Sequence, residues 1–96
     1  MEIVMSKRLF SLGQIVATPG ALALLEKHNM TPMEFLQKHV CGNFGDLCAE
    51  DKEANNEAIW NGERILSSYK INGTDKLWII TEADRSSTCC LLPEEY

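Results

Sequence analysis

The side chains best suited to metal binding lie in one short stretch of the chain. His39 and Cys41 are separated by a single residue and Cys48 follows soon after, so one nitrogen and two sulfur ligands for Zn²⁺ are available. Common structural zinc sites combine two close couples of ligands, and this spacing lacks the second couple. Val40 and Gly42 are instead typical of the end of a helix. We therefore predict no metal site and no cofactor.

The same thiols could act as catalytic nucleophiles. A cysteine is activated by a histidine that meets it in space, so either His28 or His39 could pair with Cys41 or Cys48. None of the four cysteines lies in a recognisable catalytic motif. A small buried hydrophobic side chain is the simpler interpretation of each.

The remaining cysteines indicate the compartment. Cys89 and Cys90 are adjacent, and neighbouring side chains of a strand point to opposite faces, so one of them is predicted to pack in the core. The N-terminus carries no recognisable secretory signal, which favours a cytoplasmic protein with four free thiols. No apolar run reaches the roughly 18 residues of a membrane span, so no membrane partner is expected.

The net charge of −5 is concentrated in one segment. Residues 46–63 contain six acids against Lys52 alone, while the acids and bases of the rest of the chain balance. Such a segment repels phosphate, which disfavours direct nucleic-acid binding, and attracts a basic protein surface. A solvated helix face is the alternative interpretation. The six acids are Asp46, Glu50, Asp51, Glu53, Glu57 and Glu63.

A second charged cluster consists of Glu82, Asp84 and Arg85. A pair of acids can perform general acid–base catalysis if burial separates their pKa values. A solvated turn capped by Asp84 is the simpler interpretation. Polar turn residues on a rigid sheet also form contact surfaces for partners, and we retain this cluster as such a candidate.

Three aromatic residues, Trp60, Trp78 and Tyr69, could stack on bases if a basic groove lay beside them. Packing in the core is the simpler interpretation. Trp60 lies within the acidic segment and could serve as an aromatic anchor for a partner. The nearby bases Lys70, Lys76 and Arg85 are offset by Glu63, Glu82 and Asp84.

Helix start and stop residues predict three helices within about residues 18–62. The first two begin with Thr-Pro, and the second has the spacing of a capping box. The third is predicted from about Ala49 to Asn61, with acids in its first turn. The starts and stops are Thr18 with Pro19, Asn29, Thr31 with Pro32 and Glu34, Gly42, and Gly62.

Residues from about 64 to 93 have the alternation of strands. We predict strands over Ile65–Ile71, Lys76–Ala83 and Ser87–Leu92, with a type I′ hairpin turn at Asn72-Gly73. Phe10–Ala17 is predicted to be a lead-in segment or a short strand. The sequence thus predicts a single α+β domain over residues 1–96, with three N-terminal helices followed by a three-stranded antiparallel β-meander.

Two segments, GQIVATPGAL (residues 13–22) and LWIITEADRSSTCCLLPEEY (residues 77–96), resemble a family of small bacterial proteins carried on plasmids, integrative elements and prophages. Its members are labelled plasmid-related proteins or type I restriction subunit M. The chain is too short for a methyltransferase and lacks both a glycine-rich cofactor loop and an Asn-Pro-Pro-aromatic motif. The resemblance therefore implies a mobile-element setting and no catalytic residues.

Together these patterns predict a non-enzymatic accessory protein that inhibits a host defence complex, of anti-restriction or anti-CRISPR type. Its partner would be a protein or ribonucleoprotein with a basic surface. One alternative is an antitoxin-like or regulatory module that pairs through an edge strand at Ile65–Ile71, with a partner or as a homodimer. Another is a small hydrolase using Cys41 or Cys48 with His39. The predicted partner-binding residues are Asp46, Glu50, Asp51, Glu53, Glu57, Trp60, Glu63, Glu82, Asp84 and Arg85.

Overall fold

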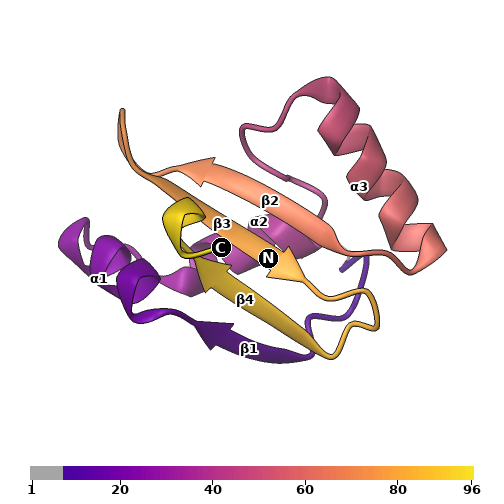
Figure 1. Ribbon diagram of the computed structural model, residues 1–96, viewed down its shortest axis with the longest axis horizontal. Coiled ribbons are helices and arrows are strands. Elements are labelled where there is room, and N and C mark those ends of the chain that lie inside the picture. The colour runs from indigo at the N-terminus through magenta and orange to yellow at the C-terminus, as the bar shows by residue number, and fades with distance from the viewer. Residues whose placement is uncertain (1–7) are drawn as a thin grey trace, which may run out of the picture.

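The computed structural model describes residues 8–96, which form a four-stranded sheet with three helices (Figure 1). This confirms the predicted α+β class. In chain order the elements are β1 (Gln14–Ala17), α1 (Pro19–Lys27), α2 (Pro32–Val40), α3 (Ala49–Asn61), β2 (Ile65–Lys70), β3 (Lys76–Thr81), β4 (Ser87–Leu91) and the short 3₁₀ helix η1 (Pro93–Glu95).

The sheet has the order β1-β4-β3-β2 and is mixed. Strands β2, β3 and β4 form the predicted antiparallel meander, and β1 lies parallel to β4. The prediction that all three helices precede a purely antiparallel three-stranded sheet is therefore wrong in detail, because a fourth strand comes before the helices. Four residues carry little periodicity, and the partner of Gln14 is Ser87, 73 positions later.

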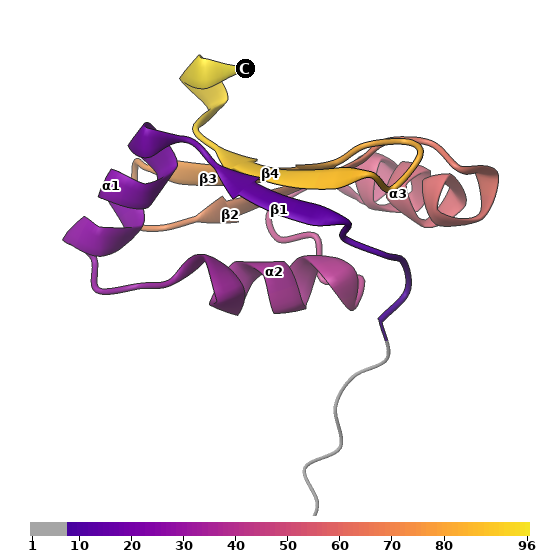
Figure 2. The ribbon, with the colours of Figure 1, turned by 90° about the horizontal axis from the view of Figure 1, so that it is seen from below.

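The two faces of the sheet are covered unequally. Figure 2 shows α2 beneath the sheet and η1 on the opposite face, while α3 lies beside the sheet at the β2 edge. The main core fills the space between the sheet, α1 and α2, and a smaller cluster of Phe44, Ala58 and Ile65 lies next to α3. The main core consists of Ala21, Leu25, Phe35, Leu36, Tyr69, Ile71, Leu77, Ile79 and Cys90.

Most helix ends match their local chemistry. The Thr18 hydroxyl accepts a hydrogen bond from the Ala21 N–H at 3.1 Å, and Gly62 ends α3 with φ +69°. Asn29 is left-handed, as predicted. The predicted capping box at Thr31 is not formed, because the Thr31 side chain caps nothing; Pro32, with its fixed φ, begins α2 without it.

The predicted two-residue hairpin at Asn72-Gly73 is also wrong. Strands β2 and β3 are joined by a five-residue loop, and neither central residue has positive φ. The Asn72 side-chain oxygen accepts hydrogen bonds from the backbone N–H groups of Thr74 and Asp75, both at 2.8 Å. This local bonding stabilises the longer loop in place of a type I′ turn.

The outer edge of β2 is covered by the chain itself, beginning with a side chain of α3. Asn55 accepts a hydrogen bond from the Leu66 N–H at 3.1 Å and donates one to the Leu66 carbonyl at 2.6 Å. The side-chain amide of asparagine has both N–H donors and a carbonyl acceptor, so it can replace the peptide of a neighbouring strand.

The segment before α3 covers the rest of this edge. Ser68 donates its N–H to the Phe44 carbonyl and accepts from the Asp46 N–H, and the Lys70 N–H donates to the Asp46 carboxylate. Gly45 permits this approach, since a Cβ there would lie 2.0 Å from the Ser68 oxygen. The edge over Ile65–Ile71, predicted to be open to another strand, is therefore already occupied, which corrects that alternative.

None of the helices within residues 8–96 combines the length and the apolar character needed to cross a bilayer.

Candidate functional site

The outer face of α3 brings most of the predicted acids together with an aromatic side chain. An α-helix turns about 100° per residue, so Glu50, Glu53, Glu57 and Trp60 share one side of α3. All four are exposed, and Trp60 is 88% exposed. A single exposed apolar side chain is common on protein surfaces, so what distinguishes Trp60 is its position beside three carboxylates on one side of α3. These four residues are called the acidic–aromatic face below.

This orientation of α3 is set by a narrow contact with the sheet. Asn55 and Ala58 are buried on the opposite side of the helix, with Ile59 half-buried beside them. Asn55 bonds to Leu66, and Ala58 packs against the ring of Phe44 and the side chain of Ile65. Because the buried residues of α3 lie on its other side, the acidic–aromatic face points away from the rest of the molecule.

Replacing Asn55 with leucine tests that orientation. We expect a loss of about 1–3 kcal/mol in the free energy of unfolding, because the Leu66 N–H and carbonyl lose their partners. Denaturant unfolding measures the loss. Asn56→Leu, a neighbouring exposed asparagine on the same helix, is the matched control. Equal stabilities of the two variants would contradict this account of how α3 is held.

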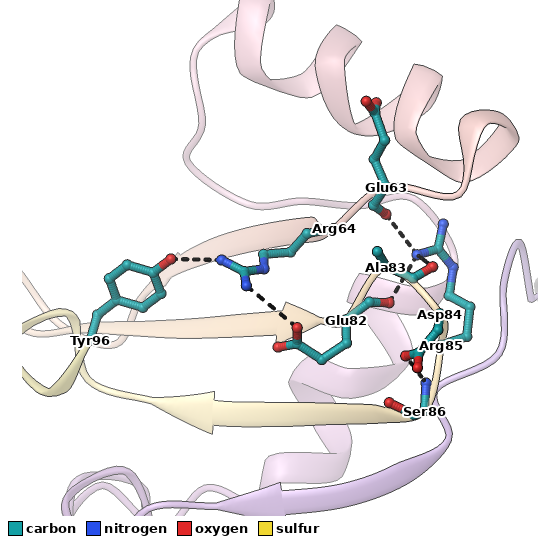
Figure 3. Close-up of polar contacts among 8 residues, drawn as sticks. All are labelled: Glu63, Arg64, Glu82, Ala83, Asp84, Arg85, Ser86 and Tyr96. Carbon is teal, nitrogen blue, oxygen red and sulfur yellow. Dashed lines mark hydrogen bonds and ion pairs between the residues drawn. The ribbon is translucent and has the colours of Figure 1, made fainter.

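Arg85 holds the C-terminal end of α3 against the β3–β4 turn. Its guanidinium donates to the carbonyls of Ala58 at 2.9 Å and Glu63 at 2.6 Å, and also to those of Glu82 and Ala83. Figure 3 shows three of these carbonyls converging on it. Arg85 was predicted to contact a partner, but in the structure its guanidinium forms hydrogen bonds to backbone carbonyls of the same chain.

Glu63, at the end of the acidic segment, lies beside the second charged cluster, and its backbone carbonyl accepts from Arg85 (Figure 3). Glu82 forms an ion pair with Arg64 at 3.4 Å, and Arg64 also donates to the Tyr96 hydroxyl. Both charged side chains are about half exposed, so the pair contributes little to stability. Asp84 caps the turn as predicted, and hydrogen bonds from Ser86 hold the pKa of its carboxyl below its usual value.

Two of the predicted acids have local roles. Asp46 is bonded to the backbone of β2, as described above, and Asp51, like Glu50, lies in the first turn of α3, where the helix dipole favours negative charge. Glu63 is exposed just beyond the helix. The acidic–aromatic face is therefore the part of the predicted set that is both gathered together and free of bonds within the described chain.

His39 lies at the centre of a buried chain of hydrogen bonds. Nδ1 lies 2.5 Å from the Ser67 hydroxyl, Nε2 lies 2.9 Å from the Thr81 hydroxyl, and Thr81 lies 2.8 Å from Thr88. The Thr88 hydroxyl donates its one proton to the Leu12 carbonyl at 2.7 Å. Thr88 must therefore accept from Thr81, which in turn accepts from Nε2–H. Ser67 then donates to Nδ1, so the neutral Nε2–H tautomer satisfies every group.

This arrangement is structural rather than reactive. Burial lowers the pKa of His39 to about 4, so the ring is neutral at pH 7. Both ring nitrogens are bonded to hydroxyls, which leaves neither for Cys41 or Cys48. A surface hollow of about 510 Å³ beside α2 is lined by Cys41 but by neither histidine. The predicted hydrolase pairing is therefore not assembled in the described residues.

The cysteines are four free thiols, as predicted. Cys90 is fully buried and Cys89 half-buried, in agreement with their predicted opposite faces. Burial raises the pKa of Cys90 to about 12, which makes it a poor nucleophile. Within residues 8–96, no group of three or more His, Cys, Asp or Glu side chains is placed to hold a metal ion.

Two of the three candidate aromatic residues pack inside the protein. Tyr69 is 4% exposed, contacts Phe35 at 5.4 Å between ring centroids, and has its pKa raised to about 12 by burial. Trp78 is half-buried against Tyr96. Trp60 differs from both in its exposure, which strengthens its assignment to a contact surface.

Sequence reasoning missed Asn55 and the hydroxyls around His39. A detectable pattern existed for both. Within their own strands, the residues two positions away from Ser67, Thr81 and Thr88 are apolar, and a polar side chain on a buried face needs a buried partner. Asn55 similarly lies three residues before Ala58, on the apolar side of an otherwise acidic helix.

The fold and site together define a small α+β protein with a mixed sheet and a peripheral acidic helix. A scan against models of protein families, a search of curated proteins and a search of solved structures found no match to this chain.

Proposed function

We propose that this protein is a non-enzymatic inhibitor of a host defence complex and docks its acidic–aromatic face onto a basic surface of that complex. Support comes chiefly from one observation: three glutamates and a largely exposed tryptophan lie together on the outer side of α3. The setting in a mobile genetic element, and the restriction or CRISPR-type target, rest on the sequence resemblance described above.

The charge of this face suits a surface that normally holds nucleic acid. Glu50, Glu53 and Glu57 are spaced three and four residues apart, so their carboxylates follow one side of the helix. Carboxylates along a helix attract lysine and arginine side chains, accelerate encounter, and lose this effect as salt rises. Association is therefore expected to weaken between low and physiological salt.

Trp60 adds an aromatic, apolar contact to the electrostatic attraction of the glutamates. An exposed tryptophan can enter a pocket of the partner or stack on an arginine guanidinium, and such anchors carry much of the binding free energy. We expect Trp60→Ala to raise the dissociation constant of the purified complex about 30-fold, corresponding to about 2 kcal/mol. Calorimetric titration measures it. The matched control is Met33→Ala, an exposed apolar residue on α2.

The decisive test reverses the charge of the face in cells. Cells with an active restriction or CRISPR-type system are transformed with a targeted plasmid, and the protein is expected to raise recovery of that plasmid. The variant Glu50→Lys, Glu53→Lys, Glu57→Lys is expected to lose this protection, because three attractions become three repulsions.

The control for that test makes the same change in net charge elsewhere. Glu26, Glu34 and Glu94 are exposed and lie outside α3, so reversing them alters total charge equally while leaving the acidic–aromatic face intact. This control variant is expected to protect as well as the original protein. Protection that survives reversal of the face, or that is lost equally in both variants, contradicts the proposal.

A further inference from the structure

The two edges of the sheet differ in whether other parts of the chain cover them. The β2 edge is covered by Asn55 and by the segment before α3, whereas β1 forms the other edge. In Figure 1 nothing described lies beyond β1 on its outer side. Open edges invite pairing with another strand, and proteins normally protect them with charge, proline or a covering segment.

The direction of the backbone groups of β1 follows from its bonds to β4. The N–H groups of Gln14 and Thr18 donate to the carbonyls of Ser86 and Cys90, at 3.0 and 2.9 Å. Because successive residues of a strand alternate, the N–H and carbonyl groups of Ile15 and Ala17 point to the outer edge. No hydrogen bond within residues 8–96 reaches these four groups.

The side chains of β1 are unusually apolar for an exposed edge. Ile15 is 45% exposed and Val16 is 41% exposed. The whole segment from Leu9 to Thr18 contains no charged residue, although about a quarter of the chain is charged. Within residues 8–96 this edge is short but has neither charged side chains nor a covering segment to prevent strand addition, in contrast to the β2 edge.

We propose that β1 pairs with β1 of a second copy of this chain, in antiparallel orientation about a two-fold axis at Val16. In this register Ile15 of each copy lies opposite Ala17 of the other, so every outward backbone group finds a partner. Gly13, with φ +62°, and Pro19 bound the strand, so no other symmetric register uses both outward residues of both copies.

The charge distribution favours a second copy as the occupant. The acidic helix α3 lies at the β2 edge, on the far side of the sheet from β1 (Figure 1). Pairing through β1 therefore keeps the two acidic helices at the outer ends of a continuous eight-stranded sheet, where their mutual repulsion is weakest. Both acidic–aromatic faces stay exposed in that dimer.

The test exploits the symmetry of the axis. Val16 faces its own copy at a non-hydrogen-bonded pair, where side chains of antiparallel strands are closest. Analytical ultracentrifugation up to about 1 mM is expected to show the wild-type chain reaching twice its mass of 10.8 kDa. Val16→Lys alone and Val16→Glu alone are each expected to sediment as a single chain. An equimolar mixture of the two is expected to restore the dimer.

The controls separate this interface from a folding defect or another contact. Met33→Lys, at an exposed apolar residue on α2, is expected to leave the dimer intact. Circular dichroism checks the fold of each Val16 variant, and recovery of the dimer in the mixture requires that both fold. A wild-type chain that stays monomeric throughout, a Val16→Lys chain that still dimerises, or a mixture that fails to associate overturns the proposal.

Discussion

Lowering the pH from 7 to 4 is expected to remove about 3 kcal/mol from the free energy of unfolding through His39 alone. The pKa of this ring is lowered by burial from 6.5 to about 4 in the folded protein. Between these values the unfolded chain binds more protons than the folded one, so stability falls as pH falls. The contribution is fully present above pH 6.5 and is lost by about pH 4.

The variant His39→Gln isolates this effect, because glutamine does not titrate and can still bond to a hydroxyl. It is expected to be less stable than wild type at pH 7 and to approach wild type as the pH falls toward 4. Urea unfolding at a series of pH values measures both curves. His28→Gln is the control for removing a histidine and is expected to keep the wild-type difference between pH 7 and 4. Parallel curves for wild type and His39→Gln would contradict the assignment.

Replacing Arg85 with methionine is expected to cost about 3 kcal/mol of stability, the upper end of what one hydrogen bond to a charged group normally contributes. The guanidinium serves four carbonyls at the end of α3 and in the β3–β4 turn, and lies 5.7 Å from the centre of the Phe10 ring. Methionine retains much of the aliphatic length and none of the donors. Hydrogen exchange is expected to increase first at the last turn of α3.

Two further substitutions separate the causes. Arg85→Lys keeps the charge but cannot reproduce the planar fork, so it is expected to lose most of the same stability. Arg85 also has φ +62°, a conformation that favours glycine, so Arg85→Gly is expected to be about 1 kcal/mol more stable than Arg85→Ala. A lysine variant as stable as wild type would show that charge, rather than geometry, holds α3.

Local chemistry was predictable from the sequence where the interacting residues are close along the chain. The bounds of α3 were predicted at Ala49 and Asn61 and observed there, because Gly62 and the acids of the first turn define both ends. The turn at Asp84 was predicted for the same reason. The hairpin at Asn72 was not, since its asparagine forms side-chain bonds to the loop instead of adopting positive φ.

Long-range pairing was the part that sequence reasoning did not reach. The segment of β1 becomes a strand by pairing with β4, which lies far along the chain. Its four residues alone favour no single structure. His39 likewise depends on hydroxyls from β2, β3 and β4 that only the sheet brings to one place. For this reason a residue considered for metal binding or catalysis became part of the core.

The acidic segment shows an intermediate case. Its position on a helix could be predicted from composition and helix ends, and its exposure follows from the helix period. The different roles of its individual residues could not be predicted from the sequence. Asp46 bonds to the β2 backbone, whereas Glu50, Glu53 and Glu57 remain on the surface with Trp60.

The placement of β4 between β1 and β3 has a consequence for synthesis. During translation β1, all three helices and the β2–β3 hairpin are synthesised before β4 exists, so a chain without β4 offers the helices α1 and α2 only part of a surface to pack on. Completion of the sheet must await residues 87–91. A released chain truncated before Ser87 is therefore expected to be digested readily by added protease, and a released chain that extends past Leu91 is expected to resist it.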